Sequence, residues 1–143
     1  MREDAETVEL PHSVTPERAF AALRDEPHVF WLDAGSGART GWSWVGAGVP
    51  DDPDAVASTP LLTVPAVPAA GGPLRTGWVG WIGYEPGAGA VGAPIAAGDP
   101  MPAQRWLRIT RLVGFEHATG RAWATAADAA SLAVRVRAAT PAA

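Results

Sequence analysis

The sequence predicts a loop-rich chain in which short β-strands outnumber two helices. Sixteen glycines and 14 prolines among 143 residues indicate many turns rather than a helical bundle. Runs rich in β-branched and aromatic residues alternate with clusters of turn residues, which is typical of strands joined by hairpins. Hydrophobic residues make up 48% of the chain, and this content favours a folded domain with a real core over disorder.

The N-terminal part predicts a short edge strand followed by a helix. Residues 7–10 suit the strand, and Pro11 closes it. Thr15, Pro16 and Glu17 together are typical of a helix start. A hydroxyl caps the first turn, proline occupies the first helical position, and a carboxylate lies at the positive end of the helix dipole.

A hairpin comes next. Residues 28–32 and 40–45 have strand composition, and glycine-rich turn chemistry separates them. Residues 46–60 contain several glycine and proline breakers and three aspartates, so we expect a solvated surface loop there. Residues 61–64 could form a further brief strand.

Residues 76–85 (TGWVGWIGYE) are the densest run of large apolar side chains in the chain. Their composition predicts a central strand, and bulky residues on both faces predict that both faces are covered. Three glycines, Gly77, Gly80 and Gly83, occur at a spacing of three. Glycine inside a strand marks a bulge or a position where another backbone or a ligand approaches closely.

The C-terminal part predicts a loop, a second hairpin and a helix. Residues 87–92 match the letters of a dinucleotide fingerprint, but prolines follow at once, so we expect a loop instead of the required helix. Residues 106–115 and 121–125 suit paired strands, with Leu107, Ile109, Val113 and Phe115 on one face. Residues 128–138 are rich in alanine and suit a helix.

Charge and cysteine content narrow the class of protein. The chain has no lysine, and its 11 arginines form no block or stripe, so we expect no nucleic-acid partner. The absence of cysteine fits a reducing cytoplasm. Neither a signal peptide nor an apolar run of membrane-spanning length is present, so we expect a cytoplasmic protein that does not associate with membranes.

No catalytic or metal-binding constellation emerges from residue spacing. The three histidines lie far apart in the sequence, no serine sits in a nucleophile elbow, and the acidic run at residues 51–54 lacks the pattern of a calcium loop. Glu85 and Glu116 end predicted strands and are the best-placed carboxylates. We therefore predict no catalytic residue and no metal ligand in this chain.

Four blocks nevertheless resemble a known family in their order and spacing: residues 29–35, 41–46, 77–85 and 113–117. They are similar to the N-terminal portion of the chorismate-utilising synthases, namely anthranilate synthase component I and, more closely, aminodeoxychorismate synthase component I. The third block is the most specific, with a motif formed by Gly77, Gly80, Gly83, Tyr84 and Glu85. The likeness covers about residues 5–125.

The resemblance implies an α+β fold in which antiparallel β-sheets carry a few packed helices, with residues 1–143 as a single domain. It also implies that chorismate, Mg²⁺ and the catalytic groups belong to a larger C-terminal portion, which would follow the helix at residues 128–138. We expect this chain to lack activity alone and to carry no cofactor. The implied partners are a separate chorismate-binding chain and a glutamine amidotransferase subunit, in folate or tryptophan biosynthesis.

The family's N-terminal portion can hold L-tryptophan, and the matching positions here are Leu32, Asp33, Ala34, Trp42, Ser43, Trp44 and Val45. A serine is usual where Ala34 stands, so one polar anchor is lost. Trp42 and Trp44 could also fill the pocket themselves. Two alternatives to the synthase reading stay open: a regulatory module that binds L-tryptophan, and an unrelated tryptophan-rich β-sandwich that stacks sugars on exposed indoles.

Overall fold

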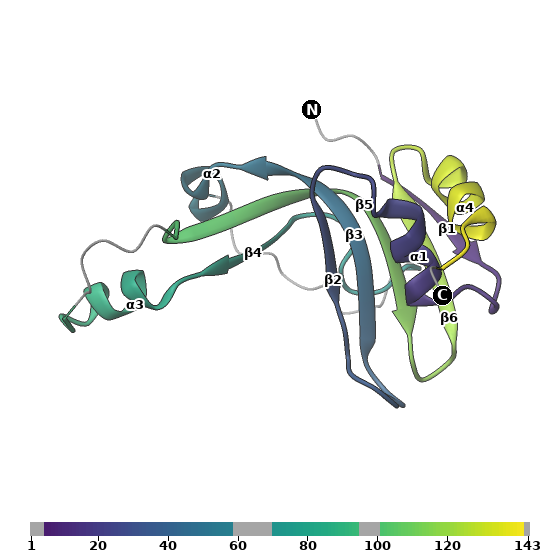
Figure 1. Ribbon diagram of the computed structural model, residues 1–143, viewed down its shortest axis with the longest axis horizontal. Helices are drawn as coiled ribbons and strands as arrows, with labels where there is room; N and C mark the ends of the chain where they lie inside the picture. Colours follow the sequence, from purple (N-terminus) through teal and green to yellow (C-terminus); the bar gives the residue numbers. More distant parts are fainter. Residues whose placement is uncertain (1–4, 59–69, 95–100, 142–143) are drawn as a thin grey trace.

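The structure, a computed structural model, describes residues 5–58, 70–94 and 101–141. Its framework is a six-stranded antiparallel sheet in the order β1-β6-β5-β3-β2, with β4 paired to the first part of β5 (Figure 1). The strands are β1 Glu6–Leu10, β2 Val29–Leu32, β3 Trp42–Asp51, β4 Trp78–Ile82, β5 Gln104–Glu116 and β6 Arg121–Ala126. The helices are α1 Pro16–Leu23, α2 Pro53–Ala57, α3 Tyr84–Ala90 and α4 Ala129–Ala138. The expected α+β class is confirmed.

Helices α1 and α4 lie side by side on one face of the sheet (Figure 1). Helix α1 starts as its sequence predicts, because the Thr15 hydroxyl accepts a hydrogen bond from the Arg18 N–H at 3.3 Å and Pro16 follows the cap. The core between helices and sheet consists of fully or almost fully buried apolar side chains. It includes Leu10, Ala19, Leu23, Val45, Val113, Phe115, Ala122, Ala124, Leu132 and Val136.

Strand β3 is longer than predicted, because it runs on through residues 46–51. The glycines that suggested a loop are required by close packing. A Cβ on Gly46 would lie 2.4 Å from the Phe30 ring, and one on Gly48 would lie 2.5 Å from the Arg108 carbonyl oxygen. The loop prediction is also wrong at Pro53–Ala57, where the Asp52 side chain caps the short helix α2. The strand suggested at residues 61–64 lies outside the described residues.

A bulge in β5 changes which side chains share a face. Ala47 of β3 pairs with Arg111 and Gly48 pairs with Ile109, so Thr110 is an extra residue in the ladder. The alternation of side chains shifts at this point. Val113 and Phe115 belong to the helix-covered core, whereas Leu107 and Ile109 do not. The prediction that all four lie on one face is therefore wrong.

Residues 76–85 do not form a central strand, and this is the main correction to the sequence analysis. Strand β4 pairs with β5 alone among the described strands, so it lies at an edge of the sheet. Trp81, Ile82 and Tyr84 are 41%, 59% and 78% exposed. We call residues 78–90 together with residues 104–108 the arm, because they reach away from the helix-covered part of the molecule (Figure 1).

The arm also contains a helix that was not expected. Helix α3 spans Tyr84–Ala90, which places part of the glycine-rich run inside the helix, and Gly92 follows it with a positive φ of 74°. A dinucleotide fingerprint needs its glycines before the helix, where amides of the first turn face the pyrophosphate. The loop prediction for residues 87–92 is thus wrong over Gly87–Ala90, which are helical. The dinucleotide fingerprint is still not formed, because its glycines lie inside and after the helix rather than before it.

Candidate functional site

The residues that match the family's tryptophan pocket meet around one buried hydroxyl. Ser43 is fully buried on β3, and its Oγ accepts a hydrogen bond from the Ala34 N–H at 3.0 Å. The same Oγ lies 3.1 Å from Asp33 Oδ1 and 2.7 Å from His117 Nε2. One hydroxyl thus joins the chain after β2, strand β3 and the turn after β5. We call these four residues the Ser43 cluster.

The connectivity of this cluster differs from that of a catalytic triad, because Asp33 contacts Ser43 rather than His117. A carboxylate can only accept, so Ser43 donates its single hydroxyl proton to Asp33 Oδ1. With that proton used, the hydrogen bond to His117 requires the tautomer that carries a proton on Nε2 and donates it to Ser43 Oγ, which is the reverse of the transfer that a nucleophilic serine requires. The hydroxyl is also fully buried, so no substrate reaches it. The cluster fastens three segments together, and residue spacing had suggested no link between Ser43 and His117.

The opposite face of the sheet carries stacked indoles rather than an open pocket. The Trp42 ring lies 6.1 Å from Trp44 and 5.4 Å from Trp123, measured between ring centroids. Gly72, at φ +86°, closes over this stack, since a Cβ there would lie 2.5 Å from the Trp42 ring. Trp44 Nε1 is buried and has no hydrogen-bond partner within the described residues.

The seven expected pocket residues thus divide between different environments. Ser43 and Val45 are fully buried, and Val45 belongs to the helix-side core. Leu32, Asp33 and Ala34 lie at the surface. The β-sandwich alternative is contradicted, because helices rather than a second sheet cover the core in the described part of the chain.

The glycine-spaced motif lies on the arm. Gly80 allows the close approach that its position predicted, because a Cβ there would lie 2.2 Å from the Arg105 carbonyl oxygen and 2.6 Å from the Trp106 ring. Gly77 has a positive φ of 118°, and Gly83 is the N-cap residue of α3. Tyr84 and Glu85 open the helix, so Glu85 does not end a strand as expected.

Asp51 fixes the arm to the end of β3. Its carboxylate accepts a hydrogen bond from Trp78 Nε1 at 2.8 Å and lies 3.8 Å from Arg108 Nε. The hydrogen bond from the Trp78 indole, followed by that from the Asp52 N–H and by the Arg108 charge, lowers the pKa of Asp51. Asp51 had been assigned to a solvated acidic loop, and that assignment is wrong.

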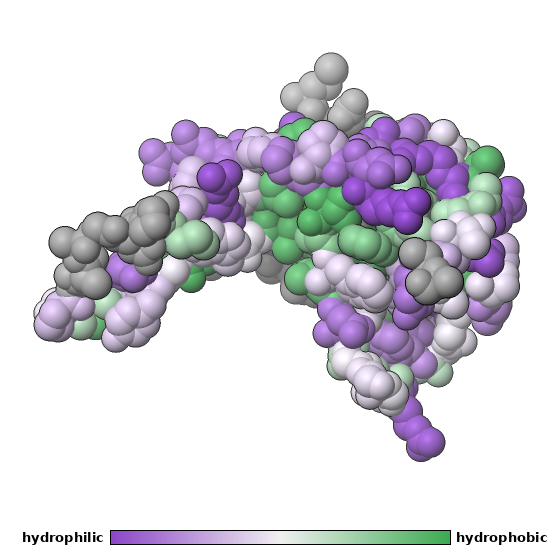
Figure 2. All heavy atoms as spheres, viewed as in Figure 1, coloured by the Kyte–Doolittle hydropathy of each residue, from purple (hydrophilic) through white to green (hydrophobic). Residues whose placement is uncertain are grey.

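A hollow of about 320 Å³ lies between the arm and strands β2 and β3. Its apolar lining comes from Phe30, Val79, Trp81, Trp106 and Leu107. Figure 2 shows apolar residues gathered in the recess between the arm and the rest of the molecule. Residue spacing did not indicate this site, although Arg105 and Trp106 are adjacent at the start of one predicted strand and Trp81 lies on another.

The described ranges contain no group of three or more histidine, aspartate or glutamate side chains that could hold a metal ion. Across the same ranges, no helix has the length and apolar character needed to cross a membrane. No model of a known protein family matches the chain, and no curated protein sequence matches it significantly. The family likeness therefore depends on the four sequence blocks described above.

Proposed function

We propose that this chain is the N-terminal domain of an aminodeoxychorismate or anthranilate synthase component I, closer to the former. In this role it would support the amination of chorismate without supplying the reacting groups. The four resembling blocks fall on strands that are neighbours in the sheet. Strand β2 pairs with β3, β3 with β5, and β5 with β4. This arrangement supports the idea that the blocks form one structural unit.

The observation that carries the proposal is the uncovered apolar arm. Trp81, Ile82 and Tyr84 are all more than one-third exposed and follow one another closely along β4 and into α3. A contiguous exposed apolar surface is typical of a protein interface. A chorismate-binding domain seated on the arm would bury these side chains.

The edge of β4 that faces none of the described strands also supports the proposal. Ile109 N–H donates to the Gly77 carbonyl and Gly83 N–H donates to the Ala103 carbonyl, so the odd-numbered residues of β4 face β5. The backbone groups of Trp78, Gly80 and Ile82 consequently point outward. Edge strands are commonly protected by charges or proline, and β4 has neither. A neighbouring domain that supplies a strand or a loop would satisfy these groups.

The chemistry of the chain agrees with a supporting role. The Ser43 hydroxyl is buried, and Asp33 contacts this hydroxyl rather than His117, unlike the order of a catalytic triad. On this proposal, chorismate, Mg²⁺ and the acids and bases all belong to the partner domain, and a glutamine amidotransferase subunit supplies the ammonia. The alternative, an L-tryptophan-binding module, has less support, because Trp42 and Trp44 stack on each other at the positions expected to line the ligand pocket.

A turnover assay tests the proposal. The chain, the chorismate-binding half of an aminodeoxychorismate synthase component I, and their mixture are each incubated with chorismate, ammonium and Mg²⁺. We expect product only from the mixture, and its identity as aminodeoxychorismate or anthranilate assigns the type of synthase. Turnover by the chain alone would refute the proposal, as would a mixture no more active than the chorismate-binding half alone.

A further inference from the structure

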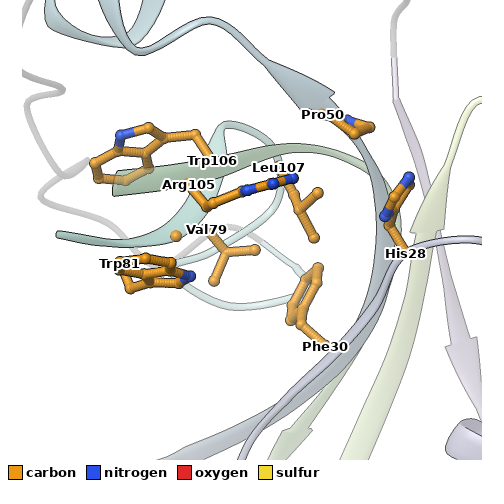
Figure 3. A pocket seen from close by; sticks show the side chains of 9 residues that line it. His28, Phe30, Pro50, Val79, Trp81, Arg105, Trp106 and Leu107 are labelled. Atoms are coloured by element: carbon orange, nitrogen blue, oxygen red, sulfur yellow. The ribbon is translucent and has the colours of Figure 1, made fainter. Parts of the chain in front are cut away.

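The hollow beside the arm combines flat aromatic walls with one cationic side chain. Val79 and Trp81 of β4 and Leu107 of β5 lie across from Phe30 of β2, and Trp106 borders the outer end (Figure 3). The Arg105 side chain extends over Val79 toward Leu107 rather than away from the hollow (Figure 3). A volume of about 320 Å³ is at the lower end of the range of small-molecule sites, which begins at about 300 Å³.

The polar side chains of the hollow differ in whether they already have a hydrogen-bond partner in the protein. The Arg105 side chain has neither an ion pair nor a hydrogen bond with any other described residue, and no described aspartate or glutamate lines the hollow. Trp106 Nε1 already donates to Gln104 Oε1 at 2.9 Å, so that indole offers only its ring. The site therefore presents the solvent-exposed guanidinium of Arg105 and the imidazole of His28 beside several apolar surfaces.

We propose that this hollow is a binding site for a small aryl carboxylate. The guanidinium of Arg105 matches a carboxylate in both charge and planar geometry. The indole of Trp81 and the ring of Phe30 would contact the flat body of the ligand, and Val79 and Leu107 would exclude water from it. A cationic ligand would be repelled by Arg105, and a purely apolar one would leave the guanidinium without a partner.

The test is a titration followed by ¹H–¹⁵N NMR, with 2-naphthoate as the probe and 2-naphthamide as its neutral counterpart. The indole N–H signals of Trp81 and Trp106 are assigned with single Trp→Phe variants. We expect 2-naphthoate to shift both signals saturably, with a dissociation constant on the order of a millimolar for a ligand of this size. The amide should bind more weakly by roughly tenfold, because it lacks the charge-assisted hydrogen bonds.

Two arginine variants separate a specific site from general attraction of anions. Arg105→Gln should weaken 2-naphthoate binding by roughly tenfold and leave 2-naphthamide binding unchanged. Arg137→Gln removes an exposed charge on α4, which does not line the hollow, and it should bind 2-naphthoate as the wild type does. The inference is overturned by non-saturable shifts, by shifts centred on other tryptophans, or by equal weakening in the two variants. It does not depend on the proposed function, since neither the probe nor the readout involves chorismate or a partner domain.

Discussion

Replacing Ser43 by alanine tests whether the Ser43 cluster holds the sheet together. The substitution removes three hydrogen bonds, to Ala34, Asp33 and His117, at distances between 2.7 and 3.1 Å. A typical intramolecular hydrogen bond contributes about 0.5–1.5 kcal/mol, and more when a charged group takes part. Asp33 and Ala34 are exposed and regain water, which reduces the total cost. We expect Ser43→Ala to lower the free energy of unfolding by about 2 kcal/mol.

Urea denaturation followed by circular dichroism measures this free energy, and the midpoint should fall while the slope stays constant. In a thermal scan, the same change corresponds to a decrease in Tm of roughly 6 °C for a domain of this size. Ser36→Ala is the matched control, because Ser36 lies exposed in the turn between β2 and β3. It should change the free energy of unfolding by less than about 0.5 kcal/mol.

A double-mutant cycle with His117→Ala isolates the contact between the two side chains. We expect a coupling energy of about 1 kcal/mol, because the two residues share a direct hydrogen bond. A Ser43→Ala protein as stable as the Ser36→Ala control would refute the fastening role of the cluster. So would two substitutions whose effects add without coupling.

Three further predictions concern other parts of the fold. Gly72→Ala should destabilise the protein by about 1–3 kcal/mol more than Gly37→Ala in urea denaturation, because both have positive φ but only Gly72 contacts the Trp42 ring. Because the pKa of Asp51 is lowered in the folded state, its contribution to stability is present above the unfolded pKa and is lost as pH falls through the folded pKa. Trp78→Phe should therefore lessen the loss of stability on acidification, as urea denaturation across pH values would show. L-Tryptophan at millimolar concentration should leave the indole N–H signal of Trp42 unshifted in NMR spectra, because neighbouring rings already pack against that side chain.

Local signals in the sequence identified the elements that depend on local chemistry. The start of α1 followed from Thr15 and Pro16, because capping and a fixed proline φ act within one turn. The hairpins followed from runs of strand formers separated by turn residues. The alanine-rich composition predicted a helix at residues 128–138, and α4 begins one residue later, at Ala129.

Features that depend on distant neighbours could not be predicted. Gly46 and Gly48 look like strand breakers, yet they continue β3 because the Phe30 ring and the Arg108 backbone need the space. The bulge at Thr110 is set by pairing with β3, and its trace in the sequence is only that Arg111 interrupts the apolar alternation of β5. A hydrogen bond between Ser43 and His117, 74 residues apart, is likewise invisible to spacing arguments.

The position of β4 shows the limit of composition as a guide. Aromatic and β-branched residues predicted correctly that this segment is a strand with apolar surface. Composition indicates that such a surface is suited to burial, but it does not indicate whether the same chain or a partner covers it. In this structure the strand lies at an edge, and Ile82 is 59% exposed. The proposed function assigns the missing cover to a chorismate-binding domain.

Binding to that domain is the most direct measurement of the central claim. Isothermal titration calorimetry compares the wild type with Ile82→Lys on the arm and Val134→Lys on α4, two exposed apolar positions at 59% and 56%. We expect the wild type and Val134→Lys to bind the chorismate-binding half of an aminodeoxychorismate synthase component I equally well. Ile82→Lys should weaken binding at least tenfold, since it places a charge in the interface. Absence of binding by the wild type, or equal binding by all three proteins, would contradict the account.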